Sequence, residues 1–173
     1  MLSAEQFAAL AHAGNNRIPV VREVLSDLDT PLSVYLKLAD GPFAYLFESV
    51  EGGARWGRYS IIGLPARRVI RVRGKRLTVT EEGETVEDRE VDDPLAEIAK
   101  LKAQYRVPQI DGLPKFAGGL VGYFGYECAS YIEPKIRADA KPDQLGMPDI
   151  CLMLAEELAV FDNLKGKLYL IVN

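Results

Sequence analysis

Polar side chains that can bind a ligand follow the end of an apolar run in the first third of the chain. The run 43–47 stops at Glu48 and Ser49, and a glycine-bearing loop with two arginines and the only tryptophan separates it from a second apolar run, 59–64. Polar groups at the end of a buried strand usually face a ligand or cap the next loop. The serine hydroxyl can donate and accept hydrogen bonds, and the carboxylate can meet an ammonium group or a nearby arginine. Ser49 is therefore a ligand contact or a turn residue, and Leu46 an apolar wall or part of the core.

The residue types that usually carry catalysis or bind metals are scarce. His12 is the only histidine, and Cys128 and Cys151 are the only cysteines, without the spacing of a metal site. Neither a Ser-His-Asp triad nor a zinc site is expected. Glu127 has no second acid or histidine placed beside it in the pattern, so we interpret it as structural. We therefore expect no catalytic residue, metal or cofactor in this chain.

Length, composition and charge exclude several classes of protein. The 173 residues can bury a substantial core, and 48% hydrophobic and 27% charged residues are typical of a globular protein. No apolar run approaches the ~20 residues needed to cross a bilayer, and we expect no signal peptide. The net charge of −4 gives no general attraction to nucleic acid or anionic lipid. These features predict a cytoplasmic protein without a nucleic-acid or membrane partner.

Local patterns predict a mixture of helices and strands. Ser3 and Gln6 have the spacing of a capping box, and Pro31 and Pro94 each follow a residue that can cap a helix. The predicted helices are 3–13, 31–38 and 94–105. Apolar or alternating runs bounded by turn residues predict strands at 18–25, 43–48, 59–64, 69–72, 77–80, 85–91, 116–123, 150–161 and 167–172, the last two as a hairpin. The result is an α+β fold with antiparallel hairpins.

A second conspicuous segment, 116–127, contains four glycines interspersed with aromatic residues. It matches neither the dinucleotide-binding fingerprint nor the phosphate-binding P-loop, which argues against a phosphate site. Glycines in or near a strand more often permit bulges and close contact between backbones. We therefore interpret this segment as a structural strand.

Three motifs, in this order, resemble the anthranilate synthase component I family of chorismate-utilising enzymes. The first is Leu-Phe-Glu-Ser, Val-Glu-Gly-Gly and Arg-Trp-Gly-Arg-Tyr-Ser at 46–60, where Phe47 replaces a leucine of the family. The second is Phe-Ala-Gly-Gly-Leu-Val-Gly-Tyr-Phe-Gly-Tyr-Glu at 116–127. The third runs from Met-Pro-Asp-Ile to Val-Phe-Asp at 147–162, and Asn163 follows it where histidine is common.

The resemblance implies a regulatory role for the first motif. In this family that segment helps to bind L-tryptophan, the feedback inhibitor, which implies Ser49, Glu48 and Leu46 as allosteric tryptophan-binding residues. It also implies antiparallel β-sheets packed orthogonally with flanking helices, with residues 1–173 as the N-terminal domain. The C-terminal chorismate-binding catalytic domain is absent, and the chain ends abruptly on an apolar strand. We therefore expect an N-terminal fragment.

The full-length protein implied by the resemblance is a lyase of tryptophan biosynthesis. It converts chorismate and ammonia to anthranilate and pyruvate with Mg²⁺, and a glutamine amidotransferase subunit, component II, supplies the ammonia. The fragment alone is expected to be inactive. Its expected partners are L-tryptophan, component II and its own C-terminal catalytic domain. Two alternatives remain: aminodeoxychorismate synthase component I, which has a related signature, and a free-standing amino-acid-binding module.

Overall fold

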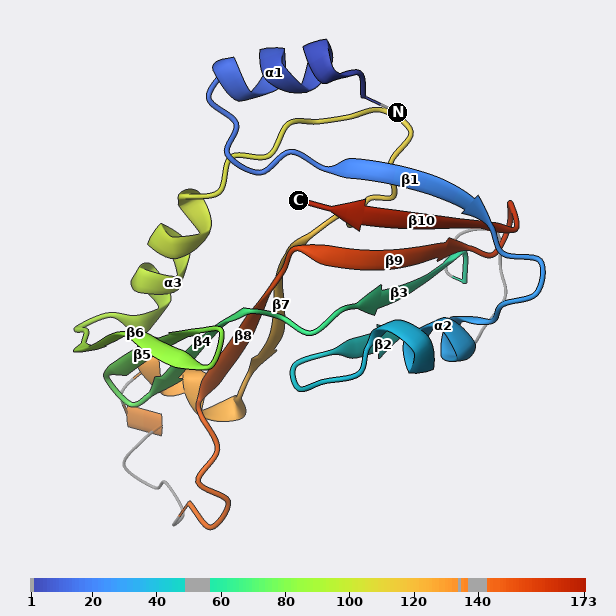
Figure 1. The fold of residues 1–173 in the computed structure, drawn as a ribbon. Helices are drawn as coiled ribbons and strands as arrows, with labels where there is room; N and C mark the ends of the chain where they lie inside the picture. Colours follow the sequence, from blue (N-terminus) through green and yellow to red (C-terminus); the bar gives the residue numbers. More distant parts are fainter. Residues whose placement is uncertain (1, 49–56, 134, 137–142) are drawn as a thin grey trace. The chain divides into compact units, whose positions relative to one another are not determined.

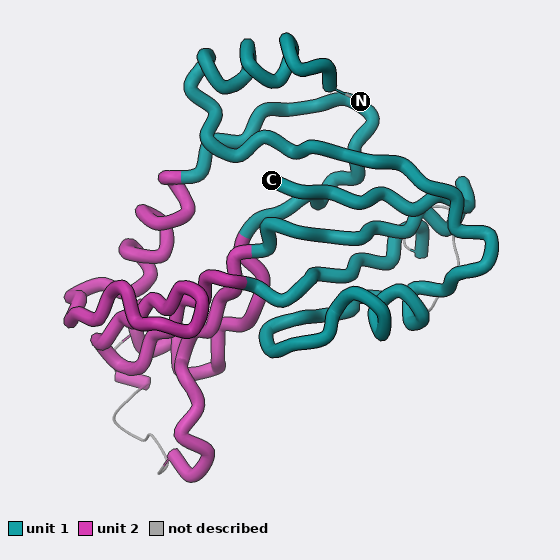
Figure 2. The backbone as a smooth tube through the Cα atoms, viewed as in Figure 1, with its two compact units in different colours: residues 1–66, 105–119, 155–173 teal, residues 67–104, 120–154 magenta. Residues whose placement is uncertain are grey.

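The chain folds into two compact units (Figures 1 and 2). A computed structural model describes residues 2–48, 57–133, 135–136 and 143–173. Unit 1 comprises residues 1–66, 105–119 and 155–173, and unit 2 comprises residues 67–104 and 120–154. The strands form two five-stranded sheets, and every strand pair whose register is defined is antiparallel. The predicted α+β class is confirmed.

The sheet of unit 1 brings together strands from both ends of the chain, in the order β1-β10-β9-β3-β2. Val34, Ile62, Phe161 and Leu168 belong to the buried cluster that joins α2 to this sheet. The elements of unit 1 are α1 (Ala4–His12), β1 (Val20–Leu25), α2 (Pro31–Leu38), β2 (Tyr45–Phe47), β3 (Tyr59–Gly63), β9 (Glu157–Asp162) and β10 (Lys167–Val172).

The two helices of unit 1 begin where the local sequence predicts. Ser3 Oγ accepts a hydrogen bond from the Gln6 amide at 3.1 Å, and Gln6 Oε1 accepts one from the Ser3 amide at 2.9 Å. Thr30 and Ser33 form the same reciprocal box in front of α2, with Pro31 at its first position. Such boxes satisfy amide groups that the first helical turn leaves without intrahelical partners. The predictions for these two helices are confirmed to within one residue at each end.

The sheet of unit 2 has the order β6-β5-β4-β8-β7. Ile70, Val79, Ile98 and Leu152 belong to its buried cluster, in which α3 contributes the apolar stripe that the sequence predicts. The elements of unit 2 are β4 (Arg68–Arg73), β5 (Arg76–Glu81), β6 (Glu84–Glu90), α3 (Pro94–Ala103), β7 (Gly119–Phe124), the 3₁₀ turn η1 (Tyr126–Cys128), α4 (Ala129–Ile132) and β8 (Ile150–Ala155). The sequence did not predict η1 or α4.

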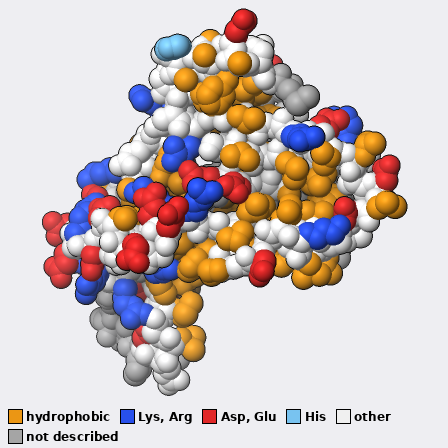
Figure 3. Space-filling view, viewed as in Figure 1, with side chains coloured by type: hydrophobic (Ala, Val, Ile, Leu, Met, Phe, Trp, Pro, Cys, Tyr) orange, Lys and Arg blue, Asp and Glu red, His pale blue; other side chains and the backbone are white. Residues whose placement is uncertain are grey.

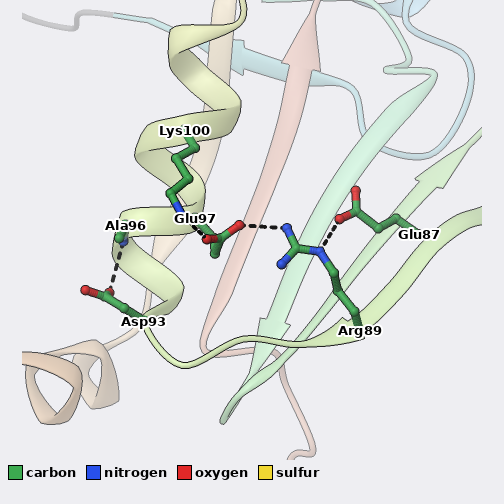
Figure 4. A network of polar contacts seen from close by, with 6 residues as sticks. All are labelled: Glu87, Arg89, Asp93, Ala96, Glu97 and Lys100. Atoms are coloured by element: carbon green, nitrogen blue, oxygen red, sulfur yellow. Dashed lines mark hydrogen bonds and ion pairs between the residues drawn. The ribbon is translucent and has the colours of Figure 1, made fainter.

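A network of exposed ion pairs joins α3 to β6 (Figure 4). Glu97 accepts hydrogen bonds from Lys100 Nζ at 2.6 Å and from Arg89 Nη2 at 2.7 Å. Asp93 caps α3, because its Oδ1 accepts a hydrogen bond from the Ala96 amide at 3.0 Å. Acidic and basic side chains crowd the face of this unit in the space-filling view (Figure 3). Because Arg89 and Lys100 are largely exposed, these pairs contribute little to stability.

The prediction of one strand over 150–161 is wrong. The structure divides this run at Glu156 into β8, which joins the sheet of unit 2, and β9, which joins the sheet of unit 1. The Glu156 carbonyl accepts a hydrogen bond from the Asn173 amide at 2.9 Å, and its carboxylate pairs with Arg17 at 3.0 Å. These contacts hold Glu156 outside both ladders. The expected final hairpin is therefore β9 with β10.

Candidate functional site

The three residues predicted to bind a ligand lie at the end of β2 and just beyond it. Leu46 is half-buried and packs against the apolar cluster of unit 1, which agrees with its interpretation as a core residue. Glu48 follows the last residue of β2 and is exposed. Ser49 lies outside the described residues. Phe47 pairs with Ile61 of β3, so Glu48 comes next in register to Ser60.

The beginning of β3 is fixed to the end of β9 by an ion pair that the sequence motifs did not reveal. Arg58 donates from Nε to Asp162 Oδ1 at 3.0 Å and from Nη2 to Asp162 Oδ2 at 2.6 Å. The Asp162 side chain is only 1% exposed, whereas that of Arg58 is 30% exposed. A bidentate ion pair of this kind defines the orientation of the guanidinium group as well as its position. Arg58 of the first motif is therefore tied to a carboxylate of the third motif.

Asn163 adds a second connection at the same place. Its amide donates to the Arg58 carbonyl at 2.8 Å, and its side-chain Nδ2 donates to Ser60 Oγ at 3.1 Å. Ser60 is 3% exposed, so this bond satisfies a buried hydroxyl. Asn163 thus performs a structural task in the β9–β10 turn, at the position where the resembling family commonly has histidine.

The same contacts shift the pKa values of the side chains around the Arg58–Asp162 pair. The hydrogen bonds from Arg58 lower the pKa of the Asp162 carboxyl, and the same bonds raise the pKa of Arg58. The guanidinium carbon also lies over the Tyr59 ring, 4.9 Å from its centroid. Burial raises the pKa of Tyr59. Both side chains of the pair are therefore held in their charged forms at neutral pH.

Within the part of the chain that the structure describes, Glu48 makes no ion pair. Arg58, which lies across the β2–β3 connection from it, is occupied by Asp162. The interpretation of Glu48 as the partner of a nearby arginine thus finds no support in the described residues. An exposed carboxylate without a cation can receive the ammonium group of a ligand.

The glycine-rich segment forms β7, and its glycines allow close backbone contact. A Cβ atom on Gly122 would lie 1.9 Å from the Cys151 carbonyl oxygen, and one on Gly118 would lie 2.5 Å from Asn173 Nδ2. Both glycines also have positive φ angles, +155° and +133°. The structural interpretation of 116–127 is confirmed for these two positions.

Asp149 of the third motif connects three segments of unit 2, a role that the sequence did not predict. Its Oδ2 accepts hydrogen bonds from the Gly74 amide and the Tyr131 hydroxyl, each at 2.6 Å. Its carbonyl accepts from the Gly125 amide at 2.7 Å and from Cys128 Sγ at 3.1 Å. Asp149 therefore stabilises the β4–β5 turn and the η1–α4 region together.

The remaining candidates for chemistry have no suitable surroundings in the described residues. Cys128 and Cys151 are free thiols, and burial raises the pKa of both. Glu127 is exposed on η1. The described residues contain no group of three or more acidic, histidine or cysteine side chains placed to hold a metal ion. None of the helices in the described part is long and apolar enough to cross a membrane.

An open cavity of about 370 Å³ lies in unit 1, away from the residues predicted to bind a ligand. Its walls include Gln6, Val21, Glu23, Asp111 and Tyr169. Glu23 is already paired with Lys167 Nζ at 2.6 Å. The cavity is a surface depression between α1, β1 and the 110–113 segment, and none of the three motifs indicated it.

Comparison with known proteins identifies relatives for the whole chain. Anthranilate synthase component 1 of Pseudomonas putida is 53% identical over 171 residues, which cover 99% of this chain and 35% of that protein. The protein of the same name from Neisseria meningitidis serogroup C is 51% identical over 175 residues, with 99% and 35% coverage. The one from Aquifex aeolicus is 39% identical over 172 residues, with 99% and 34% coverage. No family model matches the chain.

A solved structure agrees with these relatives. The crystal structure of anthranilate synthase component I from Streptococcus pneumoniae TIGR4 matches with a TM-score of 0.51 and 25% sequence identity, over 87% of this chain and 31% of that one. The chain spans about a third of the length of the curated relatives that it matches, 35% for the Pseudomonas putida protein. Over its whole length, the chain is therefore related to the N-terminal region of anthranilate synthase component 1.

Proposed function

We propose that this chain is the N-terminal regulatory and structural part of an anthranilate synthase component I. The observation that carries the proposal is the 53% identity over 99% of the chain to a protein of that name. The complete protein then converts chorismate and ammonia to anthranilate and pyruvate in the cytoplasm, as a step of tryptophan biosynthesis. Its partner is a glutamine amidotransferase, component II, which supplies the ammonia.

The catalytic residues and the Mg²⁺ site of the proposed reaction belong to the remainder of the protein. The described residues offer no acidic cluster suited to a metal ion. None of them is assigned a step in the reaction. This chain is therefore proposed to regulate the catalytic domain and to support its structure.

The regulatory site is proposed to include Leu46, Glu48 and Ser49 and to bind L-tryptophan. The ammonium group of the amino acid would meet the Glu48 carboxylate, which is exposed and unpaired within the described part of the chain. The Ser49 hydroxyl can donate and accept hydrogen bonds with the zwitterion. The edge of Leu46 that the core leaves uncovered can contact the indole. Binding here would inhibit by favouring one of two states of the complete enzyme, with a coupling free energy of about 1–3 kcal/mol.

The product formed by the full-length protein tests the proposed activity. With chorismate, an ammonium salt and Mg²⁺, the protein should release anthranilate, which is identified by its fluorescence and mass. A 4-amino-4-deoxychorismate product would instead identify the aminodeoxychorismate synthase alternative. Residues 1–173 alone should give no product above a blank without protein. Turnover by residues 1–173 alone would contradict the proposed division of labour.

A further inference from the structure

The residues near the start of β3, the end of β2 and the end of β9 lie on two different faces of the unit 1 sheet. Residues directly opposite each other in an antiparallel pair share a face, and neighbours along a strand alternate. Tyr59 pairs with Asp162, so both lie on one face. Ser60 and Leu46 lie on the other face, with the cluster that packs against α2, and continuing the alternation of β2 places Glu48 on that face too.

Arg58 departs from this alternation. It stands two residues before Ser60, directly ahead of the first residue of β3, and a regular continuation of the strand would point its side chain to the face of Ser60 and Glu48. Instead its guanidinium group lies over the Tyr59 ring and binds Asp162 on the opposite face. The backbone at Arg58 is held by the Asn163 amide, at 2.8 Å from its carbonyl. The backbone bends at 57–58, and the two hydrogen bonds to Asp162 fix the guanidinium group on that face.

We propose that Asp162 is a positioning residue for inhibition by the amino acid. By binding Arg58, it keeps this cation from forming an ion pair with Glu48. Glu48 directly follows β2 and Arg58 directly precedes β3, at the same end of this antiparallel pair, so we infer that an Arg58 side chain no longer bound by Asp162 can pair with Glu48. That pair would occupy the carboxylate that the ligand's ammonium group needs. The inference rests on the proposed function, in which Glu48 receives L-tryptophan.

A double-mutant cycle in the full-length enzyme tests this competition. The measurement is the tryptophan concentration that halves anthranilate formation, determined for Asp162→Asn, Arg58→Gln and the double variant. Asp162→Asn should raise this concentration at least about tenfold, because the ligand loses a charge-assisted contact. Arg58→Gln removes the competitor and should leave the concentration within about twofold of wild type. The double variant should return to the same range, since neither the competitor nor an unpaired buried carboxylate remains.

The double-mutant cycle distinguishes competition between Arg58 and the ligand for Glu48 from a general structural role of Asp162. Competition predicts that Arg58→Gln keeps the wild-type response although it leaves the buried Asp162 carboxylate unpaired and lowers stability. If Asp162 only supported the fold, the loss of response in the three variants would instead follow their loss of thermal stability, and Arg58→Gln would be insensitive as well. That result, or a folded Asp162→Asn enzyme with the wild-type response, would overturn the inference. If Asp162→Asn fails to fold, Asp162→Glu takes its place: it should raise the concentration less, and Arg58→Gln should again reverse the rise.

Asp149→Asn serves as the matched control, because it weakens a structural aspartate in unit 2. It should lower thermal stability without changing the tryptophan concentration for half inhibition. An equal loss of response in this control would attribute the effect to destabilisation and overturn the inference. A wild-type enzyme that tryptophan does not inhibit at all would instead refute the proposed function on which the inference rests.

Discussion

Asp162 in unit 1 and Asp149 in unit 2 hold their surroundings in different ways. Asp162 binds the cation Arg58 with both carboxylate oxygens at 3.0 and 2.6 Å, and its Oδ1 also accepts a hydrogen bond from the Lys165 amide at 3.2 Å. The Asp149 carboxylate accepts hydrogen bonds from uncharged groups, the Gly74 amide and the Tyr131 hydroxyl, both at 2.6 Å. The first aspartate ends β9, and the second directly precedes β8.

Substituting the two aspartates leaves different groups without their partner. Without the Asp149 carboxylate the Gly74 amide loses its acceptor, whereas the Tyr131 hydroxyl keeps the Gly74 carbonyl at 2.8 Å, so the effect is a loss of stability. A long guanidinium side chain that loses Asp162 can move to another carboxylate. Asp149 thus connects segments of unit 2 through uncharged groups, whereas Asp162 holds a charged side chain that, in the proposal above, can move to another carboxylate.

The largest loss of stability should come from disturbing the backbone contacts of unit 2. Gly122→Ala places a Cβ atom 1.9 Å from the Cys151 carbonyl oxygen at a φ angle of +155°. Because the obstructing atom belongs to backbone, we expect a loss of at least about 3 kcal/mol in the local free energy of unfolding. Gly166→Ala in the β9–β10 turn of unit 1 is the matched control: its φ is +61° but no atom lies within 4 Å of the added Cβ. It should cost about 1–2 kcal/mol.

Amide hydrogen exchange across β7 and β8 measures this difference directly, because it reports local opening. Gly122→Ala should accelerate exchange in these strands far more than Gly166→Ala accelerates it in β9 and β10. Similar effects of the two substitutions would show that the contact at Gly122 is not the constraint that we infer.

Acid should act on unit 1 through the Asp162–Arg58 pair. Arg58 lowers the pKa of Asp162 in the folded state, whereas an unfolded aspartate has a pKa of about 3.9. The stability from this pair is therefore fully present above about pH 4 and is lost as the pH falls through the lowered pKa. The stability difference between wild type and Asp162→Asn should shrink as the pH falls from 6 toward about 2. Urea unfolding monitored in β9 and β10 checks this, and a difference that stays constant with pH would contradict it.

The smallest losses of stability should come from removing a helix cap, and they should be equal in the two units. Thr30 caps α2 in unit 1, and Asp93 caps α3 in unit 2, each through a side-chain oxygen that accepts an amide hydrogen bond at 3.1 or 3.0 Å. Thr30→Ala and Asp93→Ala should each cost about 1 kcal/mol of local stability. Hydrogen exchange in the first turn of each helix provides the measurement. A much larger cost at one cap would mean that this helix start has contacts beyond its cap.

The sequence predicts those parts of the fold whose causes are local. Capping residues near Ser3, Thr30 and Asp93 set the helix starts, so the three helices were predicted closely. The strand pairs of β3 with β9 and of β4 with β8 join distant segments, and no local pattern specifies them. The break at Glu156 was missed for the same reason, since its partners Arg17 and Asn173 lie elsewhere in the chain.

The candidate site was predictable only in part. The end of an apolar run drew attention to Glu48 and to Ser49, which lies outside the described residues. The Arg58–Asp162 pair joins residues 104 positions apart, so it appears only once β3 and β9 are paired. The motifs contain both residues, but they do not show that one binds the other.

Tryptophan inhibition of the full-length enzyme carrying Ser49→Phe tests the regulatory assignment most directly. The substitution removes a hydroxyl hydrogen bond worth about 0.5–1.5 kcal/mol and adds a bulky ring to the proposed site. Because allosteric coupling typically amounts to about 1–3 kcal/mol, this loss can remove most of the inhibition. The variant should still form anthranilate from chorismate, while tryptophan no longer slows it. Inhibition of the variant at the wild-type tryptophan concentration would contradict the assignment of the site to this segment.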